Sequence, residues 1–476
     1  MTDNEGSKDR LSEITRDSWR LNWHQMPLTG WMNDPNGVCD YKGEYHLYYQ
    51  YTPGNAHGVG KRSWGHKVSN DLIHFIEQEI FLEPKHSYDK DGAFSGTSIE
   101  YKDKLHFFYT GNVEGQVRLG HNFDGREQNV IHVVSEDGYN IEEQEIAIPH
   151  HAFPQGYTDH IRDPKVFQVD NMFYMLLGAR TEDHHGSILC YESEDLYHWG
   201  YNGEFLEGDS QQGYMWECPD YFELNGKSIM LLSPQGILAT EYSHQNPHTT
   251  TYIMGKVNWE HPTFIPETDL LQLDYGFDFY APQTFVDRHN RRILWGWMGI
   301  GDSLPEYYNP TVHKGWQHAM TMPRELLVEN NILKQKPLKE YQELRRKKKE
   351  FRIINYSDGE LNGDSFELQL IFEDTVKEFS MKLRQDTTLS YQQGAFTLKH
   401  GGSGYGRRTR SVKIEKMDDI QIFSDTSSLE IFINDGAYVL TTRVYPEYGA
   451  NQAILIDAPV DGQLIYWPLK KVNDDW

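Results

Sequence analysis

The feature that most constrains the fold of this 476-residue chain is a unit that recurs five times before residue 330. Each copy contains a short apolar run that follows a polar turn, as expected of a strand entered through a hairpin. The runs are His46–Gln50, Leu105–Tyr109, Phe173–Leu177, Ile229–Leu232 and Ile293–Trp297. A repeat of this kind predicts a modular all-β architecture.

A second pattern recurs shortly before each run. A residue that is mostly small or acidic precedes Pro or Gly, and an apolar residue follows three positions later. The pairs are Asp34-Pro35, Ser95-Gly96, Asp163-Pro164, Cys218-Pro219 and Ala281-Pro282. The Pro and Gly members are separated by 61, 68, 55 and 63 residues. A period of roughly 60 residues with several strands per unit is typical of a β-propeller blade, so we predict a five-bladed β-propeller for residues 1–330.

Equivalent positions of successive blades point toward one axis. Alone, Asp34-Pro-Asn-Gly37 would be interpreted as a turn. In register with the later copies, Asp34 is expected at a loop-to-strand junction, held rigidly by Pro35 and directed toward a common mouth. The other groups expected there are Ser95, Asp163, Cys218 with its neighbour Glu217, and Ala281 with its neighbour Tyr280.

A different organisation follows the repeat. Residues 331–350 are predicted to form a linker with a short helix, whose basic run Arg345–Lys349 is interpreted as a solvated face rather than a phosphate patch. Alternating apolar residues over 351–476, such as Leu429–Ile433, predict a β-sandwich. The segment Gly401–Gly406 lacks the setting of a phosphate loop and is interpreted as a turn. The sandwich is expected to stabilise the propeller, with dimerisation or substrate reach as alternatives.

Composition narrows the function classes. With 45 Lys and Arg against 71 Asp and Glu, the net charge is −26, which argues against nucleic acid and anionic membranes as partners. The cysteines Cys39, Cys190 and Cys218 are odd in number and far apart, unlike a disulfide framework or a zinc site. No signal-like segment opens the sequence, and no apolar run approaches ~18 residues. We therefore expect a soluble, cytoplasmic protein.

Carboxylates at one mouth suit glycoside hydrolysis. A retaining glycosidase uses a nucleophile and a proton donor about 5–5.5 Å apart. Asp34, short and beside the potential donor Asn33, is the better nucleophile. Glu217, longer and placed between Trp216 and Cys218, is the better acid/base. Asp163, next to Arg162, is expected to stay charged and to hold sugar hydroxyls.

Four ordered motifs carry a family resemblance: Trp31–Gly37, Phe94–Gly96, Arg162–Pro164 and Glu217–Pro219. In order and spacing the chain resembles the invertase (β-fructofuranosidase) family of glycoside hydrolases over nearly its whole length. The likeness extends to segments 64–66, 278–283 and 294–297. Within that family the bacterial sucrose-6-phosphate hydrolases look most similar, judged by Gly213–Pro219.

The resemblance implies a retaining enzyme that acts on terminal β-fructofuranosyl residues without a cofactor or a metal. It implies Asp34 as nucleophile, Asp163 as transition-state stabiliser and Glu217 as acid/base. The substrate-binding residues that it implies are Trp31, Asn33, Gln50, Trp64, Phe94, Ser95, Arg162, Tyr280 and Trp297.

The expected partner is a small sugar: sucrose, sucrose 6-phosphate or a short fructo-oligosaccharide. A phosphorylated sugar would meet a cation at the cleft rim. The candidates are Lys61, Arg118, Arg126 and Arg180. A homodimer is left open.

The alternatives are a fructan or fructo-oligosaccharide hydrolase, a fructosyltransferase, an inverting furanosidase of related fold, and a non-catalytic carbohydrate-binding propeller.

Overall fold

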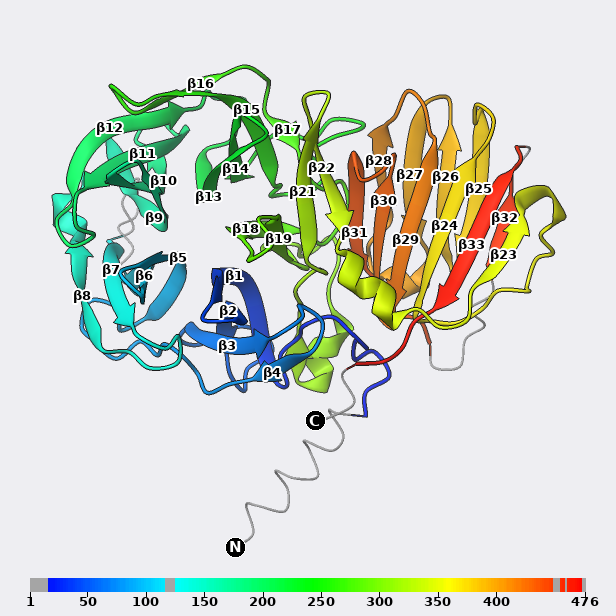
Figure 1. Ribbon diagram of the computed structural model, residues 1–476, viewed down its shortest axis with the longest axis horizontal. Coiled ribbons are helices and arrows are strands. Elements are labelled where there is room, and N and C mark those ends of the chain that lie inside the picture. The colour runs from blue at the N-terminus through cyan, green and yellow to red at the C-terminus, as the bar shows by residue number, and fades with distance from the viewer. Residues whose placement is uncertain (1–15, 116–124, 448–453, 459, 473–476) are drawn as a thin grey trace, which may run out of the picture.

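The computed structural model describes residues 16–115, 125–447, 454–458 and 460–472. In these residues the strands form seven sheets, five before the linker and two after it. Figure 1 shows the first five sheets around a common axis and the other two beside them. The chain is therefore a β-propeller followed by a β-sandwich, as predicted.

The first three sheets contain residues 30–207 and follow the chain in order. The first sheet has β1 (Gly30–Tyr41), β2 (Glu44–Thr52), β3 (Ser63–Ser69) and β4 (Phe75–Glu77). The second has β5 (Gly92–Tyr101), β6 (Lys104–Val113), β7 (Glu127–Ser135) and β8 (Glu143–Ile148). The third has β9 (Tyr157–Val169), β10 (Met172–Thr181), β11 (Gly186–Ser193) and β12 (Gly200–Glu207).

Two further sheets complete the ring. The fourth has β13 (Met215–Leu224), β14 (Lys227–Gln235), β15 (Thr251–Asn258), β16 (Thr263–Pro266) and β17 (Leu271–Gln272). The fifth has β18 (Tyr280–Val286), β19 (Arg292–Trp297), β21 (Arg324–Glu329) and β22 (Ile332–Pro337). A late strand, β20 (Trp316–Gln317), pairs in parallel with β1 and ties the end of the ring to its start.

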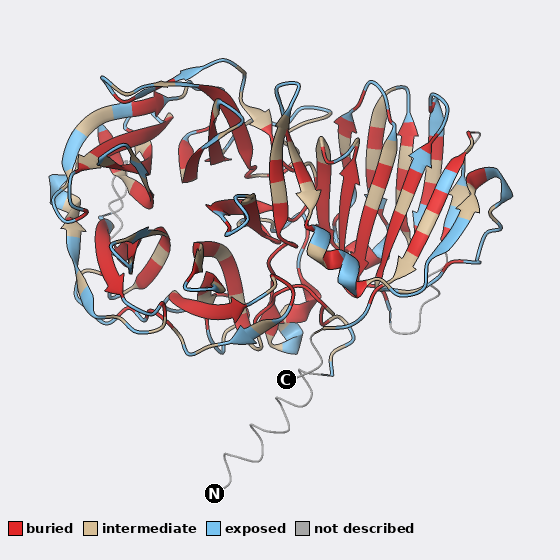
Figure 2. Ribbon diagram, viewed as in Figure 1, coloured by how far each residue is buried: buried red, intermediate tan, exposed pale blue. Residues whose placement is uncertain are grey.

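The repeat in the sequence is the repeat of the sheets. Every predicted apolar run lies in the second strand of a sheet, and every Pro or Gly pair lies in the first strand. The first strands, β1, β5, β9, β13 and β18, contact one another in succession and close on β1. These strands surround the central axis of the propeller, and Figure 2 shows them mostly buried.

A β-bulge interrupts each first strand at the repeated pair. The register shifts fall between Met32 and Pro35, Ala93 and Gly96, Arg162 and Lys165, Glu217 and Asp220, and Tyr280 and Gln283. A bulge bends its strand and redirects a side chain. Asp34 therefore lies inside a strand, at a bulge, and not at the loop-to-strand junction that was predicted.

The linker is shorter than predicted. β22 pairs with β21, so residues 332–337 extend the fifth sheet beyond residue 330. The helical turn η3 (Lys339–Leu344) follows, and the basic run lies after it rather than on its face. Arg345 Nε lies 2.6 Å from Glu367 Oε2, and its guanidinium stacks on Trp467.

The sandwich begins with β23. Its larger sheet has β23 (Lys349–Arg352), β33 (Gly462–Pro468), β24 (Phe366–Phe372), β29 (Asp419–Asp425), β30 (Ser428–Ile433) and β31 (Tyr438–Arg443). The other has β28 (Thr409–Lys413), β27 (Ala395–His400), β26 (Thr387–Gln392), β25 (Glu378–Leu383) and β32 (Leu455–Asp457). Buried and exposed residues alternate along many of these strands (Figure 2), which is why the sequence pattern identified them.

Short 3-10 helices occupy the connections. Besides η3 they are η1 (His150–Ala152), η2 (Pro310–Lys314), η4 (Ile353–Asn355) and η5 (Gly402–Gly404). The last of these forms the turn predicted for the glycine-rich segment. No helix in the described ranges has the length and apolar character that crossing a bilayer requires.

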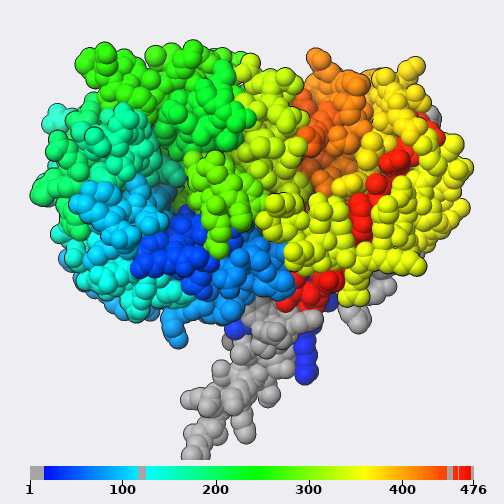
Figure 3. All heavy atoms as spheres, in the orientation of Figure 1, coloured from blue at the N-terminus to red at the C-terminus, as the bar shows by residue number. Residues whose placement is uncertain are grey.

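Buried ion pairs join the two parts, which pack into one continuous body in Figure 3. Arg324, at the start of β21, lies 2.6 Å from Glu430 Oε2 in the sandwich and 3.2 Å from Asp274 Oδ2. His24 lies between Asp425 (2.9 Å) and Glu430 (2.8 Å). Such groups are expensive to desolvate, and only their mutual contacts offset the cost. The sandwich is thereby fixed against the propeller.

Candidate active site

A cavity of about 410 Å³ opens at one end of the propeller axis. The bulges direct side chains from all five sheets toward it. Among its lining residues are the predicted Trp31, Asn33, Asp34, Gln50, Phe94, Ser95, Arg162, Asp163, Glu217, Tyr280 and Trp297. The three carboxylates, 183 positions apart in sequence from first to last, therefore share one cavity.

One predicted lining residue does not line this cavity. The side chain of Trp64 is fully buried behind the site, where its Nε1 donates to the Phe94 carbonyl at 3.0 Å. Trp64 thus holds the backbone that carries Phe94 and Ser95. A motif match identifies such a residue, but it does not show whether the residue lines the cavity or packs behind the residues that do.

Asp34 is enclosed by a hydrogen-bond network. Ser95 Oγ donates to Asp34 Oδ2 at 2.5 Å, and Asn33 Nδ2 donates to Asp34 Oδ1 at 3.1 Å. Asn33 Nδ2 also lies 2.8 Å from Gln50 Oε1, and Gln50 Nε2 donates to Ser95 Oγ at 2.6 Å. Burial raises the pKa of Asp34, and the bonds from Ser95 and Asn33 lower it in part. The two donors hold the Asp34 carboxylate in one orientation.

Asp163 is held by the backbone of the next blade. The Cys218 N–H donates to Asp163 Oδ2 at 3.0 Å. Asp163 and Cys218 both have positive φ, 63° and 47°, and Ala281 at the equivalent position has 48°. This conformation is costly for residues other than glycine and is retained where the surroundings enforce it, often at functional sites. A proline favours an extended backbone at the residue before it, and at these three positions the bulge prevails over that preference.

Glu217 has four polar contacts. Arg162 Nη2 and Nε lie 2.8 and 3.2 Å from Glu217 Oε1, the Tyr280 hydroxyl lies 2.7 Å from Oε2, and Gln235 Nε2 donates to Oε2 at 2.6 Å. Burial alone would raise the pKa of Glu217, but the Arg162 charge and these hydrogen bonds outweigh it and lower the pKa.

The charge distribution differs from the sequence-based expectation. Arg162 pairs with Glu217, while its Nε is 3.9 Å from Asp163 Oδ2. Burial raises the pKa of Asp163, the charge of Arg162 lowers it in part, and the charge of Glu217 adds to the rise. Because the three buried carboxyl groups share one cavity, their ionisations are expected to be coupled.

Several lining residues escaped the sequence analysis: Arg62, His160, Gln235, His248, Gly301 and Asp302. His160 Nδ1 lies 3.0 Å from Arg162 Nη1, and the Arg62 guanidinium stacks over Trp31 and donates to Thr52 at 2.7 Å. His160 and Arg62 flank recognised motifs, which is the one signal that could have found them. Gln235 lies at the end of β14, where no motif marks it.

The four cations predicted as possible phosphate ligands differ in whether they line the cavity. Arg126 lines the cavity, whereas Lys61 and Arg180 do not. Arg180 stacks on Tyr214 and bonds His184 outside it. Arg118 lies outside the described residues. Across the described ranges, no group of three or more His, Cys, Asp and Glu side chains is arranged to hold a metal ion.

The family comparison covers almost the whole chain. Residues 24–337 match the model described as the N-terminal domain of glycosyl hydrolases family 32, and residues 340–458 match its C-terminal counterpart. The sucrose-6-phosphate hydrolase of Bacillus subtilis (strain 168) is 37% identical over 449 residues, which cover 92% of this chain and 91% of the relative. That of Vibrio alginolyticus is 36% identical over 441 residues, 89% and 86% of the two chains.

Solved structures agree with this similarity. The sucrose-6-phosphate hydrolase from Lactobacillus gasseri superposes with a TM-score of 0.88 at 28% identity, covering 99% of this chain and 97% of the other. A β-fructofuranosidase of Bombyx mori, determined in complex with sucrose, gives 0.83 at 28% identity, with 98% and 97% covered.

Proposed function

The chain belongs to glycosyl hydrolases family 32 and is a β-fructofuranosidase, and we propose that it cleaves sucrose 6-phosphate in preference to sucrose. The similarity to sucrose-6-phosphate hydrolases supports this proposal. The observation that carries it is the position of Arg126 in the cavity wall.

Three arginines line the cavity: Arg62, Arg126 and Arg162. Arg162 binds Glu217, and Arg62 is fixed by Thr52, the Gly58 carbonyl and Trp31. Arg126 precedes β7, and the Gly125 N–H beside it donates to Asp159 Oδ2 at 2.9 Å. That contact places the segment carrying Arg126 against the segment carrying His160. Arg126 and His160 both line the cavity, and a guanidinium there suits the phosphate of a glucosyl leaving group.

For the reaction we assign a double displacement. Asp34 attacks the anomeric carbon of the fructosyl unit, and Glu217 protonates the departing oxygen of glucose or glucose 6-phosphate. Glu217 then removes a proton from the water that hydrolyses the covalent fructosyl intermediate. The donors from Ser95 and Asn33 favour an ionised, oriented Asp34.

Glu217 must become protonated in the substrate complex, although Arg162 lowers its pKa in the free protein. We assign this change to the sugar. Hydroxyl groups that engage Arg162 draw its charge away from Glu217, and the bound ring excludes water, so both effects raise the pKa of Glu217. We assign Asp163 to the sugar hydroxyls, with Trp31, Gln50, Phe94 and Trp297 around the fructose ring and Trp64 behind it.

The test is kcat/KM on sucrose, sucrose 6-phosphate and kestose, for the unaltered enzyme and for Arg126→Gln. We expect Arg126→Gln to lower kcat/KM on sucrose 6-phosphate by roughly 10- to 100-fold, the value of one charge-assisted contact, and to leave sucrose within about threefold. Arg180→Gln is the matched control and should change neither. Equal losses on both substrates, or no advantage for the phosphorylated sugar, would contradict the proposal. Faster turnover of kestose would favour the oligosaccharide alternative.

We also propose a cytoplasmic location. Cys39, Cys190 and Cys218 are all unpaired, and burial raises the pKa of Cys39 and Cys190 to about 12, which keeps both as thiols. Unpaired thiols are compatible with a reducing compartment. Activity that appears with cytoplasmic markers on fractionation would support this location, and activity in the medium would oppose it.

A further inference from the structure

A second, larger cavity of about 570 Å³ opens at the other end of the propeller axis. The same five first strands form its wall, but with the residues that follow the bulges, such as Ser98 on β5 and Lys165 on β9. The space between the two cavities is about 10 Å³, about the size of one water molecule. The second cavity is therefore separate from the candidate active site.

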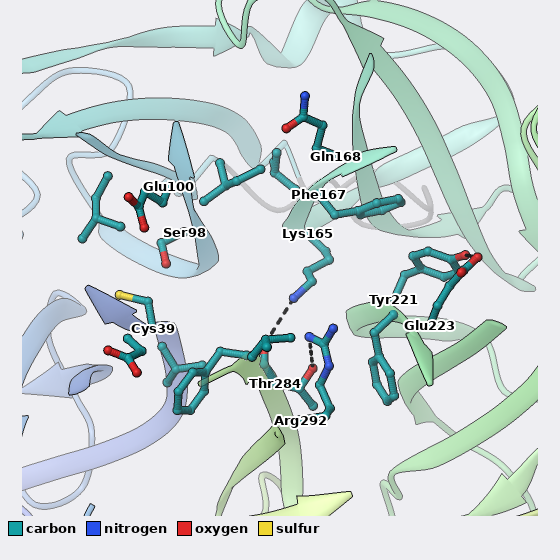
Figure 4. A pocket seen from close by; sticks show the side chains of 18 of the residues that line it. Cys39, Ser98, Glu100, Lys165, Phe167, Gln168, Tyr221, Glu223, Thr284 and Arg292 are labelled. Atoms are coloured by element: carbon teal, nitrogen blue, oxygen red, sulfur yellow. Dashed lines mark hydrogen bonds between the residues drawn. The ribbon is translucent and has the colours of Figure 1, made fainter. Parts of the chain in front are cut away.

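Two cations point into this cavity (Figure 4). Lys165 extends from β9 and Arg292 from the start of β19. Lys165 is 7% exposed, and its Nζ lies 2.9 Å from Asp220 Oδ1 and 3.4 Å from the Thr284 carbonyl. Asp220 is the counter-ion of Lys165 and is itself 1% exposed. The other oxygen of Asp220 is also engaged, because it accepts the Thr284 N–H at 2.5 Å.

The hydrogen-bond donors of the Arg292 guanidinium are poorly satisfied. Its Nη1 has one long contact, 3.4 Å to Thr284 Oγ1, and its buried Nε has no hydrogen-bond partner among the described residues. The guanidinium stacks over Phe222 at 4.8 Å. A buried donor without a partner costs about 1–3 kcal/mol, more when it is charged. Burial lowers the pKa of both Lys165 and Arg292, and their repulsion lowers that of Lys165 further.

Two cations therefore share one carboxylate at the wall of a cavity that is open to solvent. A bound anion would satisfy the idle Arg292 donors and offset the repulsion between Arg292 and Lys165. Guanidinium and ammonium groups together are typical of phosphate recognition.

The remaining lining of the cavity suits the uncharged, hydroxyl-bearing part of a ligand rather than a second anionic group. Phe167 and Tyr221 belong to the wall, where their rings pack together with centroids 4.7 Å apart, and Gln168 and Ser98 are polar residues of the lining (Figure 4). Glu100, which is exposed, lines the cavity together with Asp40 and Glu223, and these carboxylates disfavour a polyanion. The volume is within the range of cavities that hold small molecules, roughly 300–1,000 Å³.

We propose that this cavity binds a small sugar monophosphate, with the phosphate on Lys165 and Arg292 and the sugar beside Phe167 and Tyr221. The site is independent of the cavity that carries the three carboxylates. It does not depend on the preference proposed above for sucrose 6-phosphate.

Isothermal titration of the full chain with inorganic phosphate, glucose 6-phosphate and glucose tests the proposal. The titrations use the Arg126→Gln background, which removes the phosphate contact proposed for the other cavity, and we expect one saturable site for phosphate, tighter binding of glucose 6-phosphate, and no comparable site for glucose. Arg292→Gln should weaken glucose 6-phosphate binding at least tenfold. Arg352→Gln, on the sandwich surface, is the charge-matched control in the same background and should retain it.

Lys165→Gln alone would leave Asp220 buried without its counter-ion, so the Lys165→Gln, Asp220→Asn double variant is the second test. It should also lose the site while kcat/KM on sucrose shows that the chain is folded. Unchanged binding in Arg292→Gln, or no phosphate binding at tens of millimolar, would overturn the proposal. Glucose 6-phosphate that binds no tighter than inorganic phosphate would overturn the assignment of a sugar.

Discussion

The guanidinium of Arg162 binds Glu217 and not its sequence neighbour Asp163. Nη2 lies 2.8 Å from Glu217 Oε1, whereas the Nε–Asp163 Oδ2 separation is 3.9 Å. The cation thus lowers the pKa of the proposed proton donor in the free enzyme. Because of this pairing, the protonation of Glu217 depends on which groups contact Arg162. The first prediction follows from this dependence.

Replacing Arg162 with Gln should raise the pKa of Glu217, because burial then acts without an opposing charge. The alkaline limb of the pH profile of kcat/KM should move up by about one unit or more. The value of kcat/KM should also fall by roughly 100-fold, since a charged contact to the sugar is lost. Steady-state kinetics between pH 4 and 9 measures both effects. Arg180→Gln is the control, and an unmoved alkaline limb would mean that Glu217 does not set it.

Replacing Asp34 with Asn should abolish turnover with little effect on sugar binding. Asn has a similar shape but cannot form the covalent intermediate, so kcat should fall by roughly 10⁴-fold or more. Affinity for sucrose, measured by calorimetry on the variant, should change less than about tenfold. Substantial residual turnover, with contaminating enzyme excluded, would remove Asp34 from the role of nucleophile.

Replacing Glu217 with Ala should impair substrates in proportion to their need for a proton. An aryl β-fructofuranoside has an acidic leaving group and should retain far more activity than sucrose. The relevant measurement is the ratio of kcat values on the two substrates in each enzyme. Equal loss on both would show that Glu217 does not protonate the leaving group.

Replacing Ser95 with Ala removes the 2.5 Å donor to Asp34. Because that bond lowers the pKa of Asp34 against the effect of burial, the pKa should rise in the variant. A protonated Asp34 is inactive, so the acid limb of kcat/KM should move to higher pH. We expect a loss of about tenfold at neutral pH, the value of one hydrogen bond to a charged group. Ser98→Ala, on the same strand beyond the bulge, is the control.

His24 should make the stability depend on pH. Its two carboxylate partners raise its pKa above 6.5 although it is fully buried. The stabilisation is therefore complete below pH 6.5 and is lost as pH rises through the folded-state pKa. His24→Gln should lower Tm more at pH 6 than at pH 9, as measured by calorimetry.

The matched control for this stability test is His74→Gln, since His74 pairs with Asp71 at the exposed surface. That variant should change Tm little at either pH. A His24→Gln penalty that grows toward pH 9 would contradict the assigned role of His24.

The sequence by itself determined the β-propeller and the sandwich, and it predicted the three carboxylates that share the cavity. Strand alternation and turn residues are local signals, and the Pro or Gly pairs repeat because each blade needs the same bulge at the axis. Asp34, Asp163 and Glu217 could be found without coordinates because they occupy equivalent or adjacent positions in that repeat.

Only the tertiary structure decided how those groups interact. Arg162 could pair with its neighbour Asp163 or reach across to Glu217, and the orientation of side chains at the bulge decides between them. Trp64 belongs to a recognised motif, yet packing places it behind the wall. The cations Lys165 and Arg292 are 127 positions apart and carry no shared motif. Ion pairing and desolvation depend on distances of a few ångströms between segments that are remote in sequence. The sequence does not give these distances, and the three-dimensional arrangement of the blades does.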